Sequence, residues 1–316
     1  MTPVAIPVAV SATSWDAALA ETLSGAAERA FADGTHGTVH SVHHRVVNVL
    51  FCDALVAIAD DGIDDAPATI RVPLSGWDAR GIRQGAPVVG GRDRIELPGT
   101  DRMLVVSLSG APPWDAPRTD LSELTSGDLA RALALLDALP SPAPVTPFGR
   151  AAAELLRSRI RMLRAALRTG DDEGTRTAAS ALIGLGEGLT PSGDDVLTGL
   201  GLLAAQDGML LSSSLPALTD AIRGGGVRTG LLSATTMAHA VAGRGRQSLH
   251  DLIAAIRDRD GDALRRAADR ILQIGHTSGA DILSGIRLAL DVERAARRGG
   301  PACLRDDNKK KKKEQS

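Results

Sequence analysis

The chain has 316 residues, of which 43% are hydrophobic, and this content is typical of a globular protein with two domains or one large one. Its formal net charge is −2, and it contains three Trp, three Phe and no Tyr. Nucleic-acid binding is therefore not expected, because it needs basic patches and aromatic rings for stacking on bases. No apolar run reaches the roughly 18 residues that a membrane-spanning helix requires, so we expect no membrane segment.

Lysine occurs only in the run Lys309–Lys313, and all other Lys or Arg positions are arginine. The folded body thus lacks a lysine for Schiff-base, general-base or phosphate-gripping chemistry, and anion recognition is left to arginine, histidine, hydroxyls and backbone amides. We expect residues 301–316 to form a disordered tail. The distant pair Cys52 and Cys303 and the absence of a signal-peptide pattern favour a cytoplasmic protein without a disulfide.

Residues 1–117 predict a β-rich N-terminal domain with one leading helix. Apolar residues at helical spacing from Ser14 to Ala32 indicate that helix, and Asp33-Gly34 ends it. Turn residues separate short apolar segments that predict strands at 38–51, 55–59, 69–74, 86–89, 94–97 and 103–108. This pattern favours an antiparallel sheet or a small barrel.

The rest of the chain is expected to be mainly helical. Residues 118–147 are interpreted as a helix, at 126–139, flanked by Pro-rich linker, and 148–300 as a helical domain. Within that domain we predict helices at about 149–169, 171–184, 193–206, 215–223, 230–242, 247–258, 260–273 and 279–297. The predicted fold class is α+β, a β-rich domain followed by a mainly α-helical C-terminal domain with an internal pseudo-repeat.

The pseudo-repeat is a motif that occurs twice in the helical half. Residues 190–200 are Thr-Pro-Ser-Gly-Asp-Asp-Val-Leu-Thr-Gly-Leu, and residues 276–286 are His-Thr-Ser-Gly-Ala-Asp-Ile-Leu-Ser-Gly-Ile. Each copy resembles a loop that enters a helix, where free N–H groups and the positive end of the helix dipole favour a negative charge. Two such helix starts around a shared pocket would suit a small anionic molecule.

A structural explanation of the same residues stays open. Ser192 with Asp195, and Ser278 with Asp281, fit the capping box, in which Ser caps a helix and the acidic residue returns a hydrogen bond. Capping does not account for the glycine-dense approach at 184–195, since such density is typical of a backbone that comes close to another group. We therefore favour a ligand site over helix capping alone.

Another glycine-rich loop, at 223–233, also leads to a predicted helix start. Arg228 could pair with a carboxylate or phosphate, and Thr229 and Ser233 offer hydroxyls, although an exposed turn with a solvated arginine is the alternative. His276 precedes the second repeat motif, where it could donate to a polarised carbonyl or brace its own loop.

Metal sites are less favoured. Four histidines gather in one stretch, His36, His40, His43 and His44. No Cys, Asp or Glu completes a ligand set there, so packing or exposure is expected instead. Asp194, Asp195 and Asp281 could serve as Mg²⁺ ligands of a phosphotransferase, but the lysine that usually grips the phosphate is missing. We expect no metal and no cofactor.

Three strings, at 184–195, 227–233 and 275–285, resemble those of the AllH-like (YlbF-like) family, and the likeness extends to Gly37–His43 and Val47–Leu50. Members of this family are associated with oxamate carbamoyltransferase in allantoin catabolism, a route of purine degradation, alongside FdrA-like and YlbE-like subunits. The resemblance implies carbamoyl phosphate and oxamate as substrates, and oxalurate and phosphate as products. All of these are small anions, which agrees with the interpretation of the two helix starts.

On this resemblance, amides around Ser192–Asp194 and Ser278–Ala280 would bind phosphate or carboxylate, with Arg228 on the other acid and His276 or Thr277 on the carbamoyl oxygen. The expected substrate-binding residues are Gly186, Gly188, Thr190, Ser192, Gly193, Asp194, Asp195, Thr229, Ser233, Ser278, Gly279 and Asp281. The expected function is a carbamoyltransferase subunit, either active alone or active only with partners, in an oligomer of undetermined size. The alternatives are a non-catalytic metabolite-binding or scaffold subunit and a Mg²⁺-dependent phosphotransferase.

Overall fold

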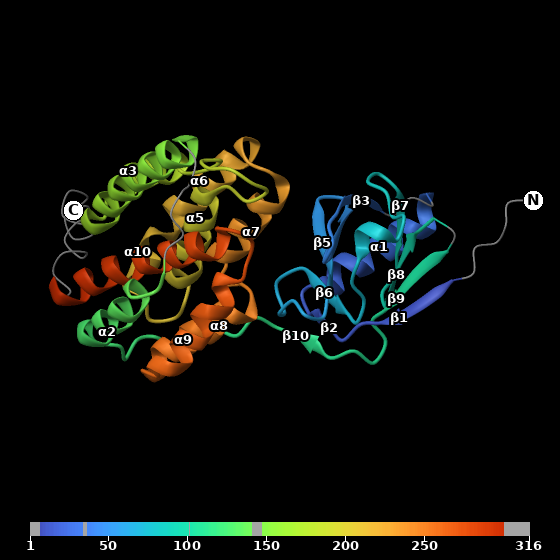
Figure 1. The fold of residues 1–316 in the computed structure, drawn as a ribbon, viewed down its shortest axis with the longest axis horizontal. Helices are drawn as coiled ribbons and strands as arrows, with labels where there is room; N and C mark the ends of the chain where they lie inside the picture. The colour runs from blue at the N-terminus through green and yellow to red at the C-terminus, as the bar shows by residue number, and fades with distance from the viewer. Residues whose placement is uncertain (1–6, 34–36, 101, 141–146, 300–316) are drawn as a thin grey trace, which may run out of the picture. The chain divides into compact units, whose positions relative to one another are not determined.

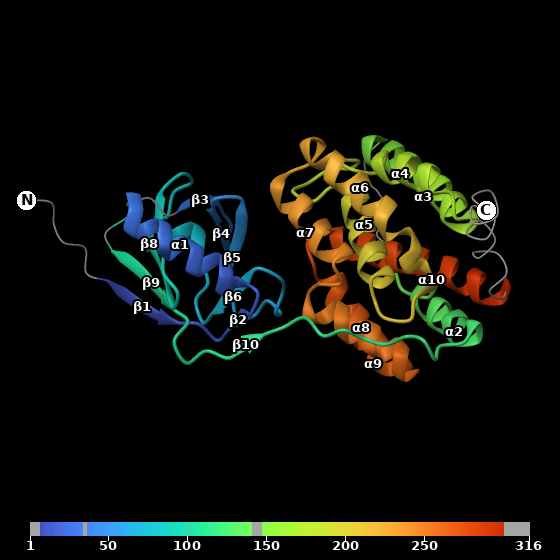
Figure 2. The ribbon, with the colours of Figure 1, turned by 180° about the vertical axis from the view of Figure 1, so that it is seen from behind.

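A computed structural model describes residues 7–33, 37–100, 102–140 and 147–299 (Figures 1 and 2). The chain divides into two compact units, one ending at Ala116 and the other beginning at Pro117. The first unit is rich in strands and the second is helical, which confirms the predicted α+β class.

The first unit is built on a ten-stranded sheet in the order β1-β9-β8-β7-β3-β4-β5-β6-β2-β10. Its strands are β1 (Val8–Ser11), β2 (Ser14–Asp16), β3 (Gly37–Val42), β4 (Val46–Phe51), β5 (Ala54–Asp60), β6 (Thr69–Val72), β7 (Pro87–Gly90), β8 (Arg94–Pro98), β9 (Met103–Ser107) and β10 (Pro113–Trp114). Most neighbours are antiparallel, but β1 with β9, β2 with β10 and β5 with β6 are parallel. The sheet is therefore mixed.

The start of the leading helix was predicted wrongly. Residues Ser14–Asp16 form strand β2, and the helix α1 (Leu19–Asp33) begins only after them. Asp16 makes this break, because its carboxylate accepts hydrogen bonds from the amides of Ala18 at 3.1 Å and Ala68 at 2.6 Å. Helix α1 then buries Leu19 and two further side chains in the hydrophobic core of the sheet.

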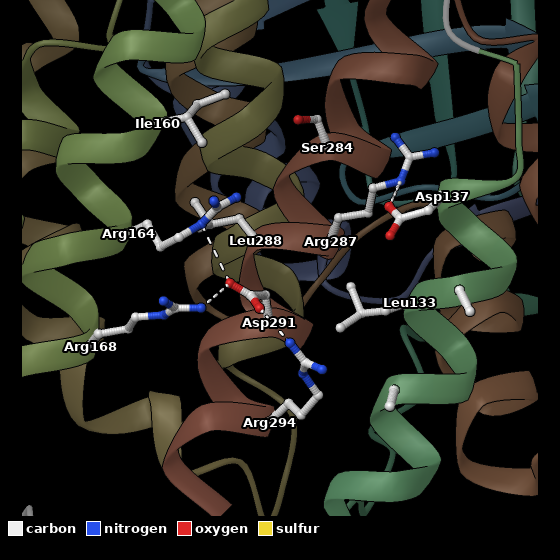
Figure 3. A pocket seen from close by; sticks show the side chains of 12 residues that line it. Leu133, Asp137, Ile160, Arg164, Arg168, Ser284, Arg287, Leu288, Asp291 and Arg294 are labelled. Carbon is white, nitrogen blue, oxygen red and sulfur yellow. Dashed lines mark hydrogen bonds and ion pairs between the residues drawn. The ribbon is translucent and has the colours of Figure 1, made fainter. Parts of the chain in front are cut away.

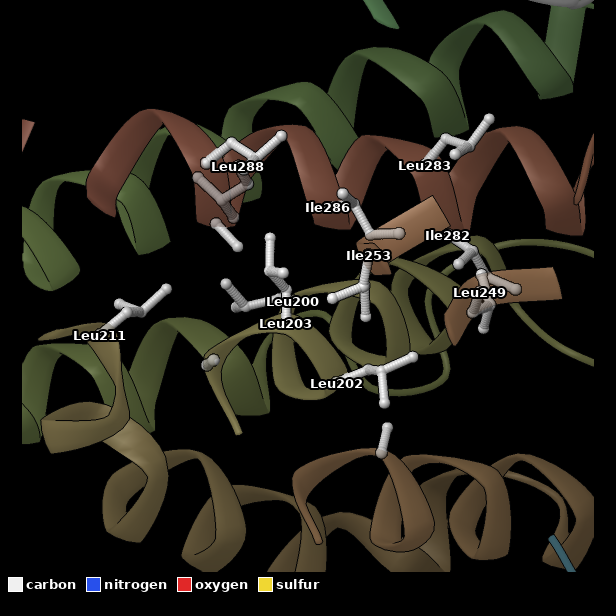
Figure 4. Close-up of a cluster of buried hydrophobic side chains, with 14 of the residues drawn as sticks. Leu200, Leu202, Leu203, Leu211, Leu249, Ile253, Ile282, Leu283, Ile286 and Leu288 are labelled. Atoms are coloured by element: carbon white, nitrogen blue, oxygen red, sulfur yellow. The ribbon is translucent and has the colours of Figure 1, made fainter. Parts of the chain in front are cut away.

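The second unit contains α2 (Ser126–Asp137), α3 (Pro147–Thr169), α4 (Asp172–Ser180), α5 (Ser192–Ala204), α6 (Leu215–Gly225), α7 (Leu231–Val241), α8 (Gln247–Asp258), α9 (Gly261–Leu272) and α10 (Ser278–Gly299), with short 3-10 turns at Leu210–Ser214 and Gly226–Arg228. Its described core consists of aliphatic and Met side chains (Figure 4), so these helices bury a continuous apolar interior with no aromatic side chain among the described core residues. Helix α2 contributes Leu129, Leu133 and Leu136 to this same core.

Two three-helix segments of the second unit, α3–α5 and α8–α10, share backbone features at matching places. Helix α3 is followed by Gly170 with φ 66° and α8 by Arg259 with φ 60°, and in each case the next residue is an aspartate that caps the following helix, Asp171 or Asp260. Beyond α4 and α9, a glycine with positive φ, Gly186 or Gly275, precedes the next helix. The likeness between the two halves thus extends well beyond the motif that the sequence repeats.

Helices α5 and α10 cross at unusually close range, and both views place them side by side (Figures 1 and 2). A Cβ atom on Gly199 would lie 2.0 Å from the carbonyl oxygen of Ile282, and one on Gly285 would lie 2.0 Å from the carbonyl oxygen of Val196. The two contacts are equivalent positions of the repeated motif. Backbone therefore meets backbone here, and this contact brings the first turns of the two helices together.

We expect Gly199→Ala to destabilise the second unit strongly. Alanine favours a helix by about 1 kcal/mol over glycine, but a methyl group 2.0 Å from a carbonyl oxygen forces the helices apart. The net loss of unfolding free energy should be about 3 kcal/mol or more, measured by denaturant unfolding. Gly224→Ala is the matched control, because a Cβ atom there meets nothing within 4 Å. Equal stability of the two variants would contradict the close crossing.

Candidate functional site

The two glycine-rich stretches singled out in the sequence, at 184–195 and 223–233, meet at the start of α5. Gly184 has φ 76°, and a Cβ atom there would lie 2.3 Å from the carbonyl oxygen of Arg228. The buried carboxylate of Asp194 joins the same segments, since it accepts a hydrogen bond from the Gly184 amide at 2.8 Å and another from the Thr229 hydroxyl. Asp194 therefore ties the loop at 184 and the loop at 229 to the first turn of α5.

The start of α10 closes on the same place through crossed hydrogen bonds. Ser278 bonds the carboxyl group of Asp195, and Ser192 bonds the carboxyl group of Asp281. Thr190 adds to the junction, with its hydroxyl oxygen 2.9 Å from that of Ser278 and its donated bond to Asp195 at 3.1 Å. Each serine of the repeated motif thus serves the aspartate of the other copy.

The capping-box explanation is wrong for the first motif. The residue that precedes α5 is Pro191, which makes no side-chain capping bond, and Ser192 already lies inside the helix. A capping box and a bond to another helix are both compatible with the spacing of Ser192 and Asp195. In the structure, these side chains bond residues of α10 and do not cap α5.

Burial changes the acidity of two carboxyl groups in this cluster. It raises the pKa of Asp195 to about 7, with the charges of Asp281 and Asp194 acting in the same direction and the hydrogen bonds from Ser278 and Thr190 opposing it. Burial likewise raises the pKa of Asp281. One oxygen of that group, Oδ2, is buried without a hydrogen-bond partner. A carboxyl group in the state of Asp195 exchanges protons near neutral pH, as general acids and bases do.

Three of the main-chain amides expected to face an anion donate hydrogen bonds within the protein. Gly193 donates its N–H to the carbonyl of Leu185 at 2.8 Å, Asp194 donates to Pro191 at 2.9 Å, and Gly279 donates to Ile274 at 3.0 Å. The structure therefore does not show these amides as open donors. What gathers at the two helix starts is a set of carboxyl and hydroxyl side chains.

Three of the four glycines expected to bind substrate lie against the protein's own backbone. A Cβ atom would lie 2.0 Å from the Leu182 carbonyl oxygen at Gly193 and 1.9 Å from the Ile271 carbonyl oxygen at Gly279. At Gly186, φ is 127° and a Cβ atom would lie 2.6 Å from the Ser192 nitrogen. These glycines let the loops pack closely against the preceding segments, and Gly188 is exposed.

The remaining expected residues differ in their surroundings. His276, Thr277 and Arg228 are exposed, and of these Thr277 bonds Asp281 while the guanidinium of Arg228 lies beside Gly225. Ser233 is buried and its hydroxyl has no hydrogen-bond partner. The rim of the cluster thus offers one arginine and one histidine to solvent.

In the described part of the chain, no three His, Cys, Asp or Glu side chains are grouped so that they could hold a metal ion. His40 lies 3.3 Å from the Ser41 hydroxyl, and His44 pairs with Asp78 at 3.2 Å on the surface. His36, Cys303 and the tail at 301–316 fall outside the described residues. Among the helices that the structure describes, none has the length and apolarity to cross a bilayer.

A cavity of about 460 Å³ between α2, α3 and α10 was not anticipated from the sequence (Figure 3). Its wall carries four arginines and two aspartates, Arg164, Arg168, Arg287, Arg294, Asp137 and Asp291. The sequence carries part of the signal, because Arg164 and Arg168 are one helical turn apart, as are Arg287 and Asp291. That spacing does not reveal that α2, α3 and α10 pack around one cavity.

We expect Asp195→Asn to flatten the pH dependence of stability between pH 4 and pH 7. The folded state keeps a proton on Asp195 that the unfolded chain releases above pH 4, so unfolding free energy falls as pH rises towards 7. At about 1.4 kcal/mol per pKa unit, this fall amounts to roughly 4 kcal/mol. Urea unfolding across this range measures it, with the exposed Asp262→Asn as control. A wild-type slope unchanged in Asp195→Asn would refute the raised pKa.

Comparison with protein families covers both units of the chain. Residues 11–113 match the family described as "AllH family N-terminal domain", and residues 182–290 match "Oxamate carbamoyltransferase subunit AllH". No solved structure matches the chain. The second match includes both repeated motifs and the loop at 223–233, so the family signature coincides with the carboxyl and hydroxyl cluster at the two helix starts. The chain belongs to the AllH family of oxamate carbamoyltransferase subunits.

Proposed function

We propose that the chain takes part directly in carbamoyl transfer between phosphate and oxamate, with its reacting groups at the starts of α5 and α10. Membership of the AllH family supports the reaction class. The observation that carries the proposal is the buried Asp195 carboxyl, whose pKa of about 7 and bonds to Ser278 and Thr190 suit proton transfer.

The chemistry calls for such a group. The nitrogen of oxamate is an amide nitrogen and therefore a weak nucleophile, so a base that removes its proton assists attack on the carbamoyl carbon. In the proposed step the new N–C bond forms, the C–O bond to phosphate breaks, Asp195 takes the proton, and phosphate leaves with the bonding electrons. The partnerless Oδ2 of Asp281 is a matching acceptor for an N–H of either substrate.

The exposed residues at the rim are proposed to hold the charged ends of the substrates. Arg228 presents a guanidinium beside the site and is suited to a carboxylate or phosphate, and His276 and Thr277 are proposed to polarise the carbamoyl oxygen. Protonation of Asp281 would reduce the repulsion of these anions, while Asp195 in its ionised form accepts the proton. The raised pKa of Asp281 is therefore compatible with anionic substrates.

A non-catalytic role is the second candidate, and one observation favours it. Asp195 is only 4% exposed and Asp194 only 1%, so the cluster is largely enclosed by its own helices. In that case the same contacts would stabilise a scaffold or a metabolite-binding subunit, and a partner chain would carry the reaction. The FdrA-like and YlbE-like proteins are the proposed partners. We further propose that the protein acts in the cytoplasm, in the breakdown of allantoin. The exposed free thiol of Cys52 is compatible with a reducing compartment.

The test is phosphate release from carbamoyl phosphate in the presence and absence of oxamate, with the chain alone and with the two companions. We expect oxamate-dependent release that Asp195→Asn lowers in kcat by about 10²-fold to 10⁴-fold, the range for loss of a general base. Asp262→Asn, an exposed aspartate on α9, should leave the rate unchanged.

Assembly must be measured on the same samples by size-exclusion chromatography. If Asp195→Asn forms the complex and keeps full activity, Asp195 is not the base, and the scaffold role becomes the better account. A rate that depends on added Mg²⁺ beyond its effect on substrate would instead favour the phosphotransferase.

A further inference from the structure

We propose that the cavity between α2, α3 and α10 is a second ligand site, which binds an organic anion that has an apolar body and a phosphate or carboxylate head. This site shares no residue with the carboxyl and hydroxyl cluster described above. The proposal is independent of carbamoyl transfer, and either can fail without the other.

The arginines that line the cavity carry more positive charge than the lining aspartates can neutralise. Asp291 accepts hydrogen bonds from Arg168 at 2.7 Å and from Arg294 at 3.1 Å, and it lies 3.4 Å from the Nε of Arg164. Three guanidinium groups therefore share one carboxylate, as Figure 3 shows. A carboxylate cannot neutralise three cations, so the wall retains positive charge for another anion.

The fourth arginine is partly buried, and its acidic neighbour is largely exposed. Arg287 has a side chain only 23% exposed, donates to the carbonyl of Leu136, and has the largely exposed Asp137 3.5 Å from its Nε as its acidic neighbour. Burial lowers the pKa of Arg287, which means that its charged form lacks the solvation it has in water. An anionic head next to this guanidinium would replace that solvation.

The buried Nε atoms of three cavity arginines are incompletely satisfied by the protein. Those of Arg164 and Arg287 lie 3.4 Å and 3.5 Å from carboxylate oxygens of Asp291 and Asp137, and neither they nor the Nε of Arg294 make a hydrogen bond. Buried N–H groups normally find an acceptor, because leaving one unsatisfied costs free energy. The charge of these guanidinium groups is therefore only partly compensated within the protein.

The rest of the lining is apolar and sets the kind of ligand. Leu133, Ile160 and Leu288 line the cavity beside the arginines (Figure 3), together with alanines of α2. A volume of about 460 Å³ lies in the range of sites for drug-sized ligands, roughly 300–1,000 Å³. Carbamoyl phosphate and oxamate are much smaller and have no apolar part, so they would leave this lining uncovered. The geometry fits a larger amphiphilic anion.

Titration calorimetry on the full-length chain tests the site with 1-naphthyl phosphate, which joins a dianionic head to an apolar body. We expect saturable binding with one site per chain. Inorganic phosphate and 1-naphthol each carry half of the recognised chemistry and should bind at least tenfold more weakly. 1-Naphthoate distinguishes a carboxylate from a phosphate head, and tight binding of either naphthyl anion supports the proposal.

Two substitutions locate the binding. Arg287→Gln and Arg164→Gln should each weaken 1-naphthyl phosphate about tenfold or more, whereas Arg265→Gln, an exposed arginine on α9, should have no effect. Arg164 is 41% exposed, so its variant tests the site even if Arg287→Gln fails to fold, as judged by circular dichroism. Absence of saturable binding at millimolar ligand, equal binding of inorganic phosphate, or unchanged affinity in both folded variants would overturn the proposal.

Discussion

The backbone contact between α5 and α10 is the constraint on which the rest of the helical unit depends. Gly199 and Gly285 remove the side chains that would separate the helices, and each meets a carbonyl of the partner helix. Because the contact lies two turns beyond the start of each helix, it also fixes the distance between their first turns. The crossed bonds from Ser278 to Asp195 and from Ser192 to Asp281 need that distance.

The close contact also determines the chemistry of the carboxyl groups. Helices that approach this closely exclude water from between them, and exclusion of water disfavours the charged form of an acid. Hydroxyl donors from the opposite motif limit the cost of burial without removing it, so Asp195 titrates near neutral pH. Asp194 has a structural role in the same cluster, since both of its oxygens accept hydrogen bonds and hold two loops in place.

Much of the fold could be predicted from the sequence, because periodicity and turn residues are local signals. The helices predicted between 149 and 297 lie close to their predicted ranges. Helix α4 is shorter than predicted, because the chain turns after Ser180 and Gly184 adopts the left-handed conformation. Strands β1, β2 and β10 were missed because they are short and pair with distant segments, as β1 does with β9.

The sequence indicated which segments meet at the two helix starts, but it did not indicate the bonds between them. The repeat and the glycine-rich loops correctly indicated which segments meet. A serine three residues before an aspartate, however, satisfies either a capping box or a bond to another helix, and only the tertiary arrangement decides between them. The arginine-lined cavity was missed for a similar reason, because Arg164 and Arg287 come from helices that the sequence does not pair.

Reciprocal serine–aspartate bonds join the two helix starts, and a double-mutant cycle can detect them in solution. The measurement compares the unfolding free energies of Ser278→Ala, Asp195→Asn, the double variant and the wild type. Residues in direct contact have coupling energies of about 0.5–3 kcal/mol, whereas independent sites are additive within about 0.3–0.5 kcal/mol. We expect a coupling of about 1 kcal/mol between Ser278 and Asp195. Additive effects of the two substitutions would show that the bond does not join the helix starts.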